Sequence, residues 1–413
     1  MVPNGWERNP IKDLCESIID CVNKTAKHVE HVTPFKMIRT TNVRNGRVDT
    51  NNVRYVEEDT YKQWIRRGAP KDGDIIFTRE APVGEAGILE NAQGIFLGQR
   101  TMMYRSNPER SDNRYLFYSL MSGYCQKQIE DFSNGGTVAH MRVPDCGELI
   151  INTPPLPEQQ KIAQILSTWD QAISTTEKLI ETSKQQKKNL MQQLLTGKKR
   201  LVDPETGEEF EGEWEEVELG KITSIYDGTH STPKYVEKGI PFYSVEHLTR
   251  DDFSNTKFIT EDVFEKENKR VKLERDDILM TRIGDIGTAK HLNWDVCASF
   301  YVSLALIKAN KSKFDSAYMG YYINSHEFHR ELYKRTIHVA FPKKINLGEI
   351  NHCNVLLPSI NEQQKIASVL TAADKEIEVL QAKLTHFKQE KKALMQQLLT
   401  GKRRVKVDKA EAA

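Results

Sequence analysis

The chain has 413 residues, of which 38% are hydrophobic and 28% are charged, and its formal net charge at pH 7 is +1. This length suffices for two domains of about 150 residues each with additional helices. The composition is typical of a soluble globular protein, and no run of about 18 apolar residues is present that could span a membrane. The near-zero charge argues against a simple DNA-binding module, because such modules are usually strongly basic.

The first residues and the cysteines bear on where the protein works. The opening MVPNGWERNP lacks an apolar signal core, so we expect no export. The six cysteines form no Cys-x-x-Cys pair and match no zinc pattern. We therefore expect a cytoplasmic protein with reduced thiols and no metal site of its own.

Residues 1–153 predict a first domain that mixes strands with helices. In DIIFTREAPVG, an aspartate leads an apolar strand that ends in Thr-Arg and a glycine turn. A helix is predicted over 115–130, and ELIINTPPLPEQQ reads as an apolar strand that meets prolines and then a helix. We expect an α/β or α+β domain.

Residues 154–200 predict a long helical segment. Its apolar positions repeat in steps of three and four, which is the pattern of a coiled-coil seam, and Thr176, Ser183 and Lys187 interrupt it. Gly197 stands where the helix should end, with the basic KKR after it. Forty helical residues span about 60 Å.

Residues 201–357 predict a second domain of the same class, followed by a second helical segment at 358–404 and a tail at 405–413. DILMTRIGDIG resembles DIIFTREAPVG of the first domain, and a helix is predicted over 318–334. In the second helical segment only Lys391 interrupts the seam, Asn361 provides a capping-box-like start, and Gly401 marks the end.

An internal duplication organises the whole chain. EQQKIA and LMQQLLTGK each occur twice with the same offset of 204 residues, and 158–200 matches 362–404 at 23 of 43 positions. Two matched heptad segments in one chain favour an antiparallel intramolecular pair over homodimerisation or ordinary core packing. The predicted fold is thus a pseudo-twofold repeat, in which two diverged domains are joined by an antiparallel coiled coil.

The residues that we assign to the seam and to partner binding share the two repeated motifs. In the first helix they are Glu158, Gln159, Gln160, Ile162, Leu166, Ile173, Leu190 and Leu194, and in the second they are Glu362, Gln363, Gln364, Ile366, Leu370, Ile377, Leu384, Leu394 and Leu398.

At this point the chain resembles the specificity subunits of type I restriction–modification systems. The resemblance is carried by PPLPEQQKIA at 154–163, by LMQQLLTGK, by the repetition of both, and by DGTHSTPKYVEKGIPFYSVEHL at 227–248. It implies two target-recognition domains, each reading one half of a split site in double-stranded DNA, and helices that bind two methyltransferase subunits. Restriction and translocase subunits would join through the complex. The first domain lacks the G-T-x-x-x-P-x-Y opening, so the two domains should read unrelated sequences.

Three catalytic patterns are missing, which agrees with a recognition subunit that is not itself an enzyme. NTPPL lacks the Asn-Pro-Pro-aromatic pattern of a DNA methyltransferase, and GDIGTAK is a glycine turn of a hairpin rather than a P-loop. PDCGELI has no lysine of a nuclease site. We expect S-adenosylmethionine, ATP and magnesium on the partner subunits and none of them on this chain.

Loops rich in Arg, Lys, Asn, Ser and Thr are the candidates for reading base edges. The residues are Arg39, Thr41, Asn42, Arg44, Asn45 and Arg47 in RTTNVRNGR; Asn134, Thr137, His140 and Arg142 in SNGGTVAHMR; Thr229, His230, Ser231 and Lys234 in DGTHSTPK; and Arg335, His338, Lys343 and Lys344 in KRTIHVAFPKK. Solvated turns remain the alternative for each loop. The equivalent Arg79 and Arg282 are expected to serve the fold or backbone contact.

Two other functions stay open from the sequence alone. One is a scaffold without DNA, in which the coiled coil joins two ligand-binding domains, and the weaker one is a self-contained modification enzyme. A specificity subunit needs a methyltransferase partner and a split DNA site, and these two requirements distinguish it from both alternatives.

Overall fold

The computed structural model describes residues 2–133 and 139–407. The chain forms two compact units, one of residues 1–177 with 382–413 and one of residues 178–381. The division predicted from the sequence keeps each long helix whole, whereas each unit contains a part of both helices.

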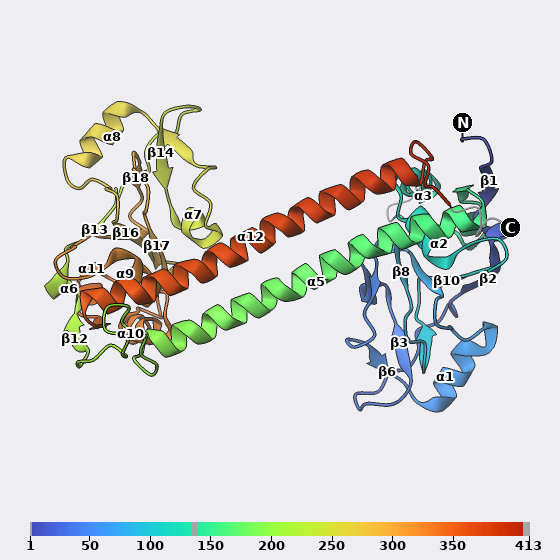
Figure 1. Cartoon of the computed structure of the whole chain (residues 1–413), viewed down its shortest axis with the longest axis horizontal. Coiled ribbons are helices and arrows are strands. Elements are labelled where there is room, and N and C mark those ends of the chain that lie inside the picture. Colours follow the sequence, from blue (N-terminus) through green and yellow to red (C-terminus); the bar gives the residue numbers. More distant parts are fainter. Residues whose placement is uncertain (1, 134–138, 408–413) are drawn as a thin grey trace. The chain divides into compact units, whose positions relative to one another are not determined.

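The domain of the first unit is built on a four-stranded antiparallel sheet (Figure 1). Its order is β2 (Cys15–Asp20), β10 (Thr101–Ser106), β7 (Ile75–Arg79) and β8 (Val83–Ile88). A second sheet has the order β6 (Arg54–Tyr55), β3 (Lys36–Ile38) and β9 (Ile95–Leu97), and β1 (Glu7–Pro10) pairs with β11 (Ile150–Thr153). The remaining elements are the hairpin β4 (Val43–Arg44) and β5 (Arg47–Val48), the helices α1 (Glu58–Trp64), α2 (Asn113–Leu120), α3 (Gly123–Ser133) and α4 (Val143–Gly147), and the 3-10 turns Ile11–Leu14, Thr40–Asn42 and Ile65–Arg67.

The domain of the second unit repeats this topology. Its main sheet has the order β13 (Ile225–Asp227), β19 (Leu304–Ile307), β16 (Ile278–Ile283) and β17 (Asp285–His291). Its smaller sheet has the order β15 (Lys257–Ile259), β14 (Ile240–Tyr243) and β18 (Ser299–Phe300), and β12 (Glu215–Glu218) pairs with β20 (Asn354–Leu357). The helices are α6 (Leu219–Ile222), α7 (Val245–Arg250), α8 (Glu261–Asn268), α9 (Ser316–Ile323), α10 (His326–Arg335) and α11 (Leu347–Asn351).

The matching strand orders confirm the predicted duplication of an α/β domain. The two copies differ after the first strand of the smaller sheet, where the first domain has the β4–β5 hairpin and the second has helix α7. Both insertions pack on the main sheet, the hairpin on β8 and α7 on β16 and β17. The domains therefore share a core and vary in what covers it.

Two single helices predicted from the sequence are each a pair of helices. The expected helix at 115–130 is interrupted between α2 and α3, and the one at 318–334 is interrupted between α9 and α10. In both copies a serine side chain accepts a hydrogen bond at the start of the second helix, Ser122 from Cys125 N and Ser325 from Phe328 N. Such caps begin a new helix, and hydrophobic periodicity alone did not reveal them.

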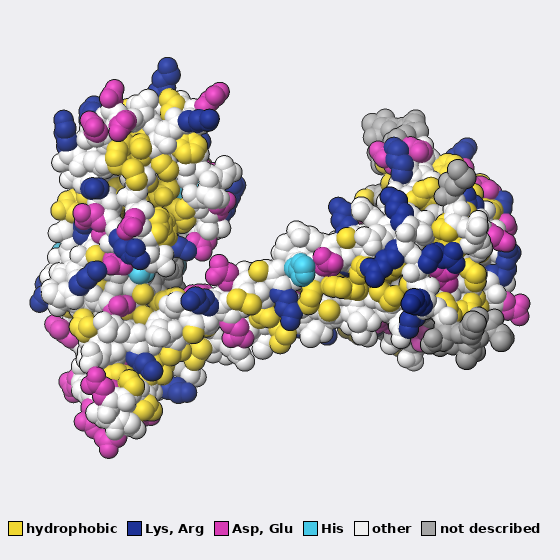
Figure 2. All heavy atoms as spheres, turned by 45° about the horizontal axis from the view of Figure 1, so that its top comes forward, with side chains coloured by type: hydrophobic (Ala, Val, Ile, Leu, Met, Phe, Trp, Pro, Cys, Tyr) yellow, Lys and Arg dark blue, Asp and Glu magenta, His cyan; other side chains and the backbone are white. Residues whose placement is uncertain are grey.

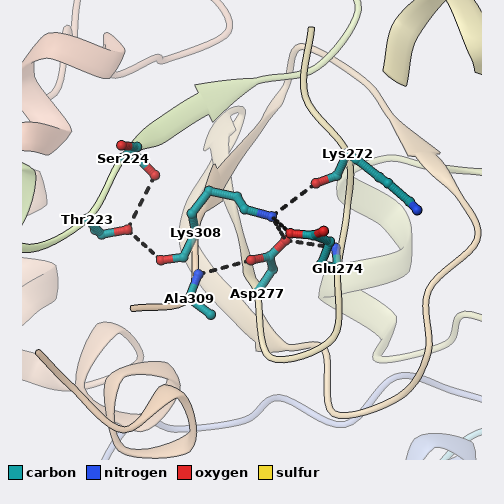
Figure 3. Close-up of polar contacts among 7 residues, drawn as sticks. All are labelled: Thr223, Ser224, Lys272, Glu274, Asp277, Lys308 and Ala309. Carbon is teal, nitrogen blue, oxygen red and sulfur yellow. Dashed lines mark hydrogen bonds and ion pairs between the residues drawn. The ribbon is translucent and has the colours of Figure 1, made fainter. Parts of the chain in front are cut away.

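The aspartate that leads each repeated apolar strand is part of a buried ion pair. Asp74 bonds to Arg105 in the first domain, and Asp277, which is only 1% exposed, bonds to Lys308 at 2.6 Å in the second. Figure 3 shows that Glu274 and the backbone oxygen of Lys272 also approach the ammonium group of Lys308. Burial lowers the pKa of Lys308, but the carboxylates of Asp277 and Glu274 outweigh burial and raise it. The repeated aspartate therefore stabilises the fold.

We predict that Asp277→Ala lowers the free energy of unfolding of the second unit by about 3 kcal/mol, because Lys308 loses its buried partner. Urea unfolding of the full chain measures this change. The control is Lys334→Ala, which removes an exposed pair with Glu331 and should cost less than about 1 kcal/mol. Equal effects of the two substitutions would contradict a structural role for Asp277.

The two long helices are α5 (Leu156–Leu194) and α12 (Ile360–Leu398). Both end as predicted, because Gly197 and Gly401 have φ values of 68° and 70°, the left-handed conformation that closes a helix. The predicted start at Asn361 is wrong, since α12 begins two residues after Pro358 and the hydroxyl of Ser359 accepts the hydrogen bond from Glu362 N at 3.3 Å.

The two helices run antiparallel inside each unit. In the first unit Asp170 bonds to Lys391 and the ring of Trp169 contacts that of Phe387, while in the second Ser183 bonds to Glu376. Most predicted seam residues are buried and three are half-buried: buried are Ile162, Leu166, Ile173, Leu194, Ile366, Leu370, Ile377 and Leu398, and half-buried are Leu190, Leu384 and Leu394. The polar interruptions Thr176 and Ser183 are buried in the same seam.

Candidate nucleic-acid interface and helix surfaces

Each EQQ motif opens a helix with a buried glutamate. Glu158 accepts two hydrogen bonds from Arg404, at 2.7 and 2.6 Å, and one from the indole of Trp6 at 3.1 Å. In the other unit Glu362 accepts two from Arg200, at 2.6 and 2.8 Å, and the Arg200 guanidinium lies over the Trp214 ring. The basic residues that follow the helix-ending glycines thus bind the start of the other helix.

The first glutamine of each motif is buried as well. The Gln159 amide accepts from Asp112 N and donates to Pro154 O, and the Gln363 amide accepts from Asp315 N and donates to Pro358 O. These bonds tie the start of each long helix to the domain before it. The prediction of a partner-binding role therefore does not hold for Glu158, Gln159, Glu362 and Gln363, whose polar groups are used inside the chain, while Gln160 and Gln364 are exposed.

The lysines that interrupt the seam belong to a second repeated cluster. Lys391 and the hydroxyl of Tyr118 both bond to Asp170, each at 2.6 Å. In the second unit Lys187 and the hydroxyl of Tyr321 bond to Asp374, at 2.6 and 2.8 Å. Since each lysine also lies over its tyrosine ring, these polar residues join both helices to the neighbouring domain.

Apart from the residues that form these internal contacts, a set of exposed residues is also identical in both helices. On α5 it comprises Lys184, Gln185, Lys188 and Gln192, and on α12 it comprises Lys388, Gln389, Lys392 and Gln396. At about 100° per residue each group occupies a stripe about 100° wide, which we call the Lys–Gln stripe. Although Lys388 also pairs with Glu177 of α5 at 3.0 Å, the repetition of all four exposed positions indicates a repeated surface.

In the second domain, Arg282 brings the two predicted recognition loops together. Its guanidinium donates to Val302 O at 2.6 Å and to Ile345 O at 3.2 Å, and Val302 N donates to Thr229 O. The loop at 227–234 and the loop at 335–344 therefore meet at one end of the main sheet. Burial lowers the pKa of Arg282, and the charge of Asp227 opposes this shift. The expected structural role of Arg282 is confirmed.

Asp227 organises the first of these loops. It is 7% exposed and bonds to His230 at 2.8 Å and to Arg270. Burial raises the pKa of Asp227, but the hydrogen bonds from Arg270 and His230 outweigh burial and lower it. The carboxylate thus holds an exposed imidazole at the surface beside Ser231.

The candidate residues of the second domain differ in their access to a ligand. Exposed ones are His230, Ser231, Lys234, His338, Lys343 and Lys344. Thr229 is buried, with its hydroxyl bonded to Ser231 O, and Arg335 is half-buried and bonds to His352 O. We therefore assign the last two to the fold.

In the first domain, RTTNVRNGR begins directly after β3 and forms a 3-10 turn and most of the β4–β5 hairpin. Asn42 is buried and its amide bonds to Arg39 N and Asn52 O, so it holds the turn. Arg44 donates to Thr40 O, and Arg47 bonds to Glu177 of α5. Thr41 and Asn45 are exposed, and their side chains do not hold the backbone of the turn as Asn42 and Arg44 do. Arg39 is half-buried. This loop is a weaker candidate than its sequence indicated.

The second candidate loop of the first domain is described only in part. Asn134 and Thr137 lie outside the described residues. His140 is exposed, and its backbone forms an isolated antiparallel β-bridge with Glu80. Arg142 is exposed and forms an ion pair with Asp145. Arg79 donates to Met141 O at 3.3 Å, as Arg282 does to Ile345 O, so this loop corresponds to 335–344.

The loop after β2 was missed by the sequence analysis. Asp20 bonds to Arg67 as Asp227 bonds to Arg270, which makes this loop the counterpart of 227–231. It exposes Asn23, Lys24 and Thr25, and Thr25 bonds to Gln99. The shared aspartate at the strand end is a signal that could have revealed it.

The comparisons with known proteins identify the family. A family model described as the type I restriction modification DNA specificity domain matches residues 3–185 and 211–388. The chain therefore belongs to this family and carries two copies of its domain. It is a sequence-reading specificity subunit, and this membership confirms both the resemblance and the expectation of a non-catalytic role.

Relatives and solved structures match over nearly the whole chain. The putative type I restriction enzyme MjaX specificity subunit of Methanocaldococcus jannaschii is 29% identical, covering 98% of this chain and 95% of its own. The EcoKI specificity subunit of Escherichia coli K12 is 23% identical, covering 88% and 81%. A crystal structure of the type I restriction–modification S subunit from M. genitalium superposes with a TM-score of 0.59 at 19% identity, covering 97% and 98%, and shares the fold.

Two absences concern residues 2–133 and 139–407, the described part of the chain. No helix there is both long and apolar enough to cross a membrane. In the same residues, no group of three or more His, Cys, Asp or Glu side chains could hold a metal ion.

We predict that Arg282→Met loosens both recognition loops of the second domain. Loss of hydrogen bonds worth about 1.5 kcal/mol should accelerate amide exchange at 300–303 and 337–345 by about tenfold. Hydrogen exchange followed by mass spectrometry measures this. Arg275→Met is the control, because its pair with Asp295 is exposed, and unchanged exchange in the Arg282 variant would contradict the assignment.

Proposed function

We propose that each domain reads one half of a bipartite site in double-stranded DNA and that the two helices set the distance between the half-sites. The observation that carries this is the contrast between the repeats. The clusters that join helices and domains are the same in both units, whereas the covering elements and recognition loops differ. A repeated frame with diverged loops suits two different targets in one site.

The charge distribution bears on how DNA is held. On the face of the second domain in Figure 2, Lys and Arg side chains are mixed with Asp and Glu. Residues 203–218 alone contain nine acids and no base. Because DNA affinity depends on many phosphate contacts, this chain needs a basic partner for tight binding.

The Lys–Gln stripe supports a methyltransferase partner in two copies. Its occurrence on both helices offers the same surface twice, so one partner chain can bind each copy. Restriction and translocase subunits would join through that complex. S-adenosylmethionine, ATP and magnesium belong on those partners, and the cytoplasm is the compartment that we propose.

We predict that native mass spectrometry shows one copy of this chain with two methyltransferase chains. Introducing Lys188→Glu with Gln192→Glu should reduce the limit to one partner chain, and adding Lys392→Glu with Gln396→Glu should abolish binding. Thr182→Glu on an exposed, unrepeated position is the control. A limit of one partner chain for the unaltered protein would refute the proposal.

We further predict that the paired helices act as a ruler. Since each unit contains a part of both helices, an insertion must be made in both, after Ser174 and after Glu378. Four residues in each add about 6 Å and nearly a full turn, which should widen the gap by roughly two base pairs. Two residues rotate the seam by about 200° and should disrupt pairing.

Genome-wide mapping of methylated bases measures the gap in both variants. A four-residue variant that remains active with the original gap, or that changes the bases read, would rule out the ruler. A split site in the map would also exclude the alternative scaffold, which predicts no such site.

A further inference from the structure

The loop between α10 and α11 exposes large apolar side chains at its tip. Phe341 and Val339 have relative exposures of 105% and 97%, as if neither contacted the rest of the chain. Isolated exposed apolar residues are common, but two in one short loop are a feature that needs a ligand or a partner.

This loop is held in place rather than loosely attached. Ile337 N donates to Lys344 O at 2.8 Å, closing the base of the loop, and Gly284 N of the β16–β17 turn donates to Lys343 O at 2.8 Å. The next residue, Ile345, is completely buried. The apolar tip is therefore presented by a fixed β-bridge, which limits the ordering cost of binding.

The surroundings of the tip are basic. Lys343 and Lys344 follow Phe341 after Pro342, and both are exposed. His338 is exposed on the other side, where its ring lies 4.4 Å from that of Tyr333. Asp285 follows Gly284, which bonds to this loop, and its carboxylate accepts a hydrogen bond from Thr281. A polyanion with flat apolar faces matches this combination better than an apolar protein surface.

We propose that Phe341 is a wedge that enters a base step of the half-site read by the second domain, with Lys343 and Lys344 on the flanking phosphates. Apolar wedges of this kind partly unstack one step, and the phosphate contacts offset the cost. The proposal rests on the proposed DNA-reading function and adds the manner of contact. Arg282 connects the base of this loop, at Ile345 O, through Val302 to the loop that carries His230, so the wedge and this base-reading candidate belong to the same end of the main sheet.

The test uses the full chain with its methyltransferase subunits and duplexes that contain the mapped site. 2-Aminopurine is placed at each position of the second half-site in turn, and its fluorescence reports unstacking. The unaltered complex should raise fluorescence several-fold at one step. Phe341→Ala should abolish this rise and weaken binding about 10- to 100-fold, the range expected for loss of one base stack.

Control variants separate the wedge from charge and from folding. Phe341→Leu should retain part of the signal, and Lys343→Ala should keep the signal while reducing the salt dependence of binding by about one phosphate contact. Val32→Ala removes another exposed apolar side chain, in the first domain, and should change nothing.

The outcomes distinguish the two levels of the proposal. If the unaltered complex binds no site selectively, the proposed function fails and the wedge with it. If it binds selectively while Phe341→Ala leaves affinity and fluorescence unchanged, or weakens binding with no unstacked step in the unaltered complex, only the wedge is overturned. Loss of self-association in Phe341→Ala with DNA binding intact would assign the tip to a second copy of this chain and also overturn it.

Discussion

The two buried glutamates at the helix starts are the constraint on which the rest of the structure depends. Glu158 and Glu362 are almost inaccessible to water, and each has a bidentate arginine from the segment that follows the other helix. A buried carboxylate without a partner would be strongly destabilising, so the antiparallel arrangement of the helices is required by chemistry and not only favoured by apolar contact. The same glutamate in the first unit also binds Trp6 at the start of the domain.

Each unit is therefore assembled from three distant parts of the sequence: a domain, the start of one helix and the end of the other. The Tyr–Asp–Lys clusters repeat this principle further along the helices, with Tyr118 in one unit and Tyr321 in the other. Because both clusters combine charge, hydrogen bonds and aromatic rings, they fix orientation as well as proximity. The recognition loops lie on a sheet whose position relative to the helix parts of its own unit is set by these contacts.

Much of this fold could be predicted from the sequence, because repetition and periodicity are local signals. The seam residues such as Leu166 and Leu370, the stops at Gly197 and Gly401, and the turn at Gly284 follow from spacing and residue type. The roles of Glu158, Gln159 and Lys391 could not be predicted in this way, since their partners are about 50 to 250 residues away. Polar residues that are identical in both copies were interpreted as a binding surface. Some of them are identical because they are buried and bonded inside the chain.

The candidate interface was predicted less well, for a similar reason. Composition selected loops that contain the right chemical groups, but it could not tell Asn42, which holds a turn, from Asn45, which is exposed. It also missed the loop after Asp20, because loops were chosen by composition and not by their position after a shared aspartate, whose pairing with Arg67 and Arg270 makes the two loops equivalent. Arg282, chosen as a structural residue, turned out to join the two loops of its domain.

The location of the repeated clusters has an evolutionary consequence. Their members lie on the long helices, in the segments that directly follow them, next to the first strand, or on the helix that follows the main sheet, and none lies in a recognition loop. A gene rearrangement that replaces the segment between these points would exchange the DNA target without separating the partners of any of these clusters. Such a chain can change its target through recombination in one step, whereas a domain whose binding loops were themselves bonded to the helices would need compensating mutations.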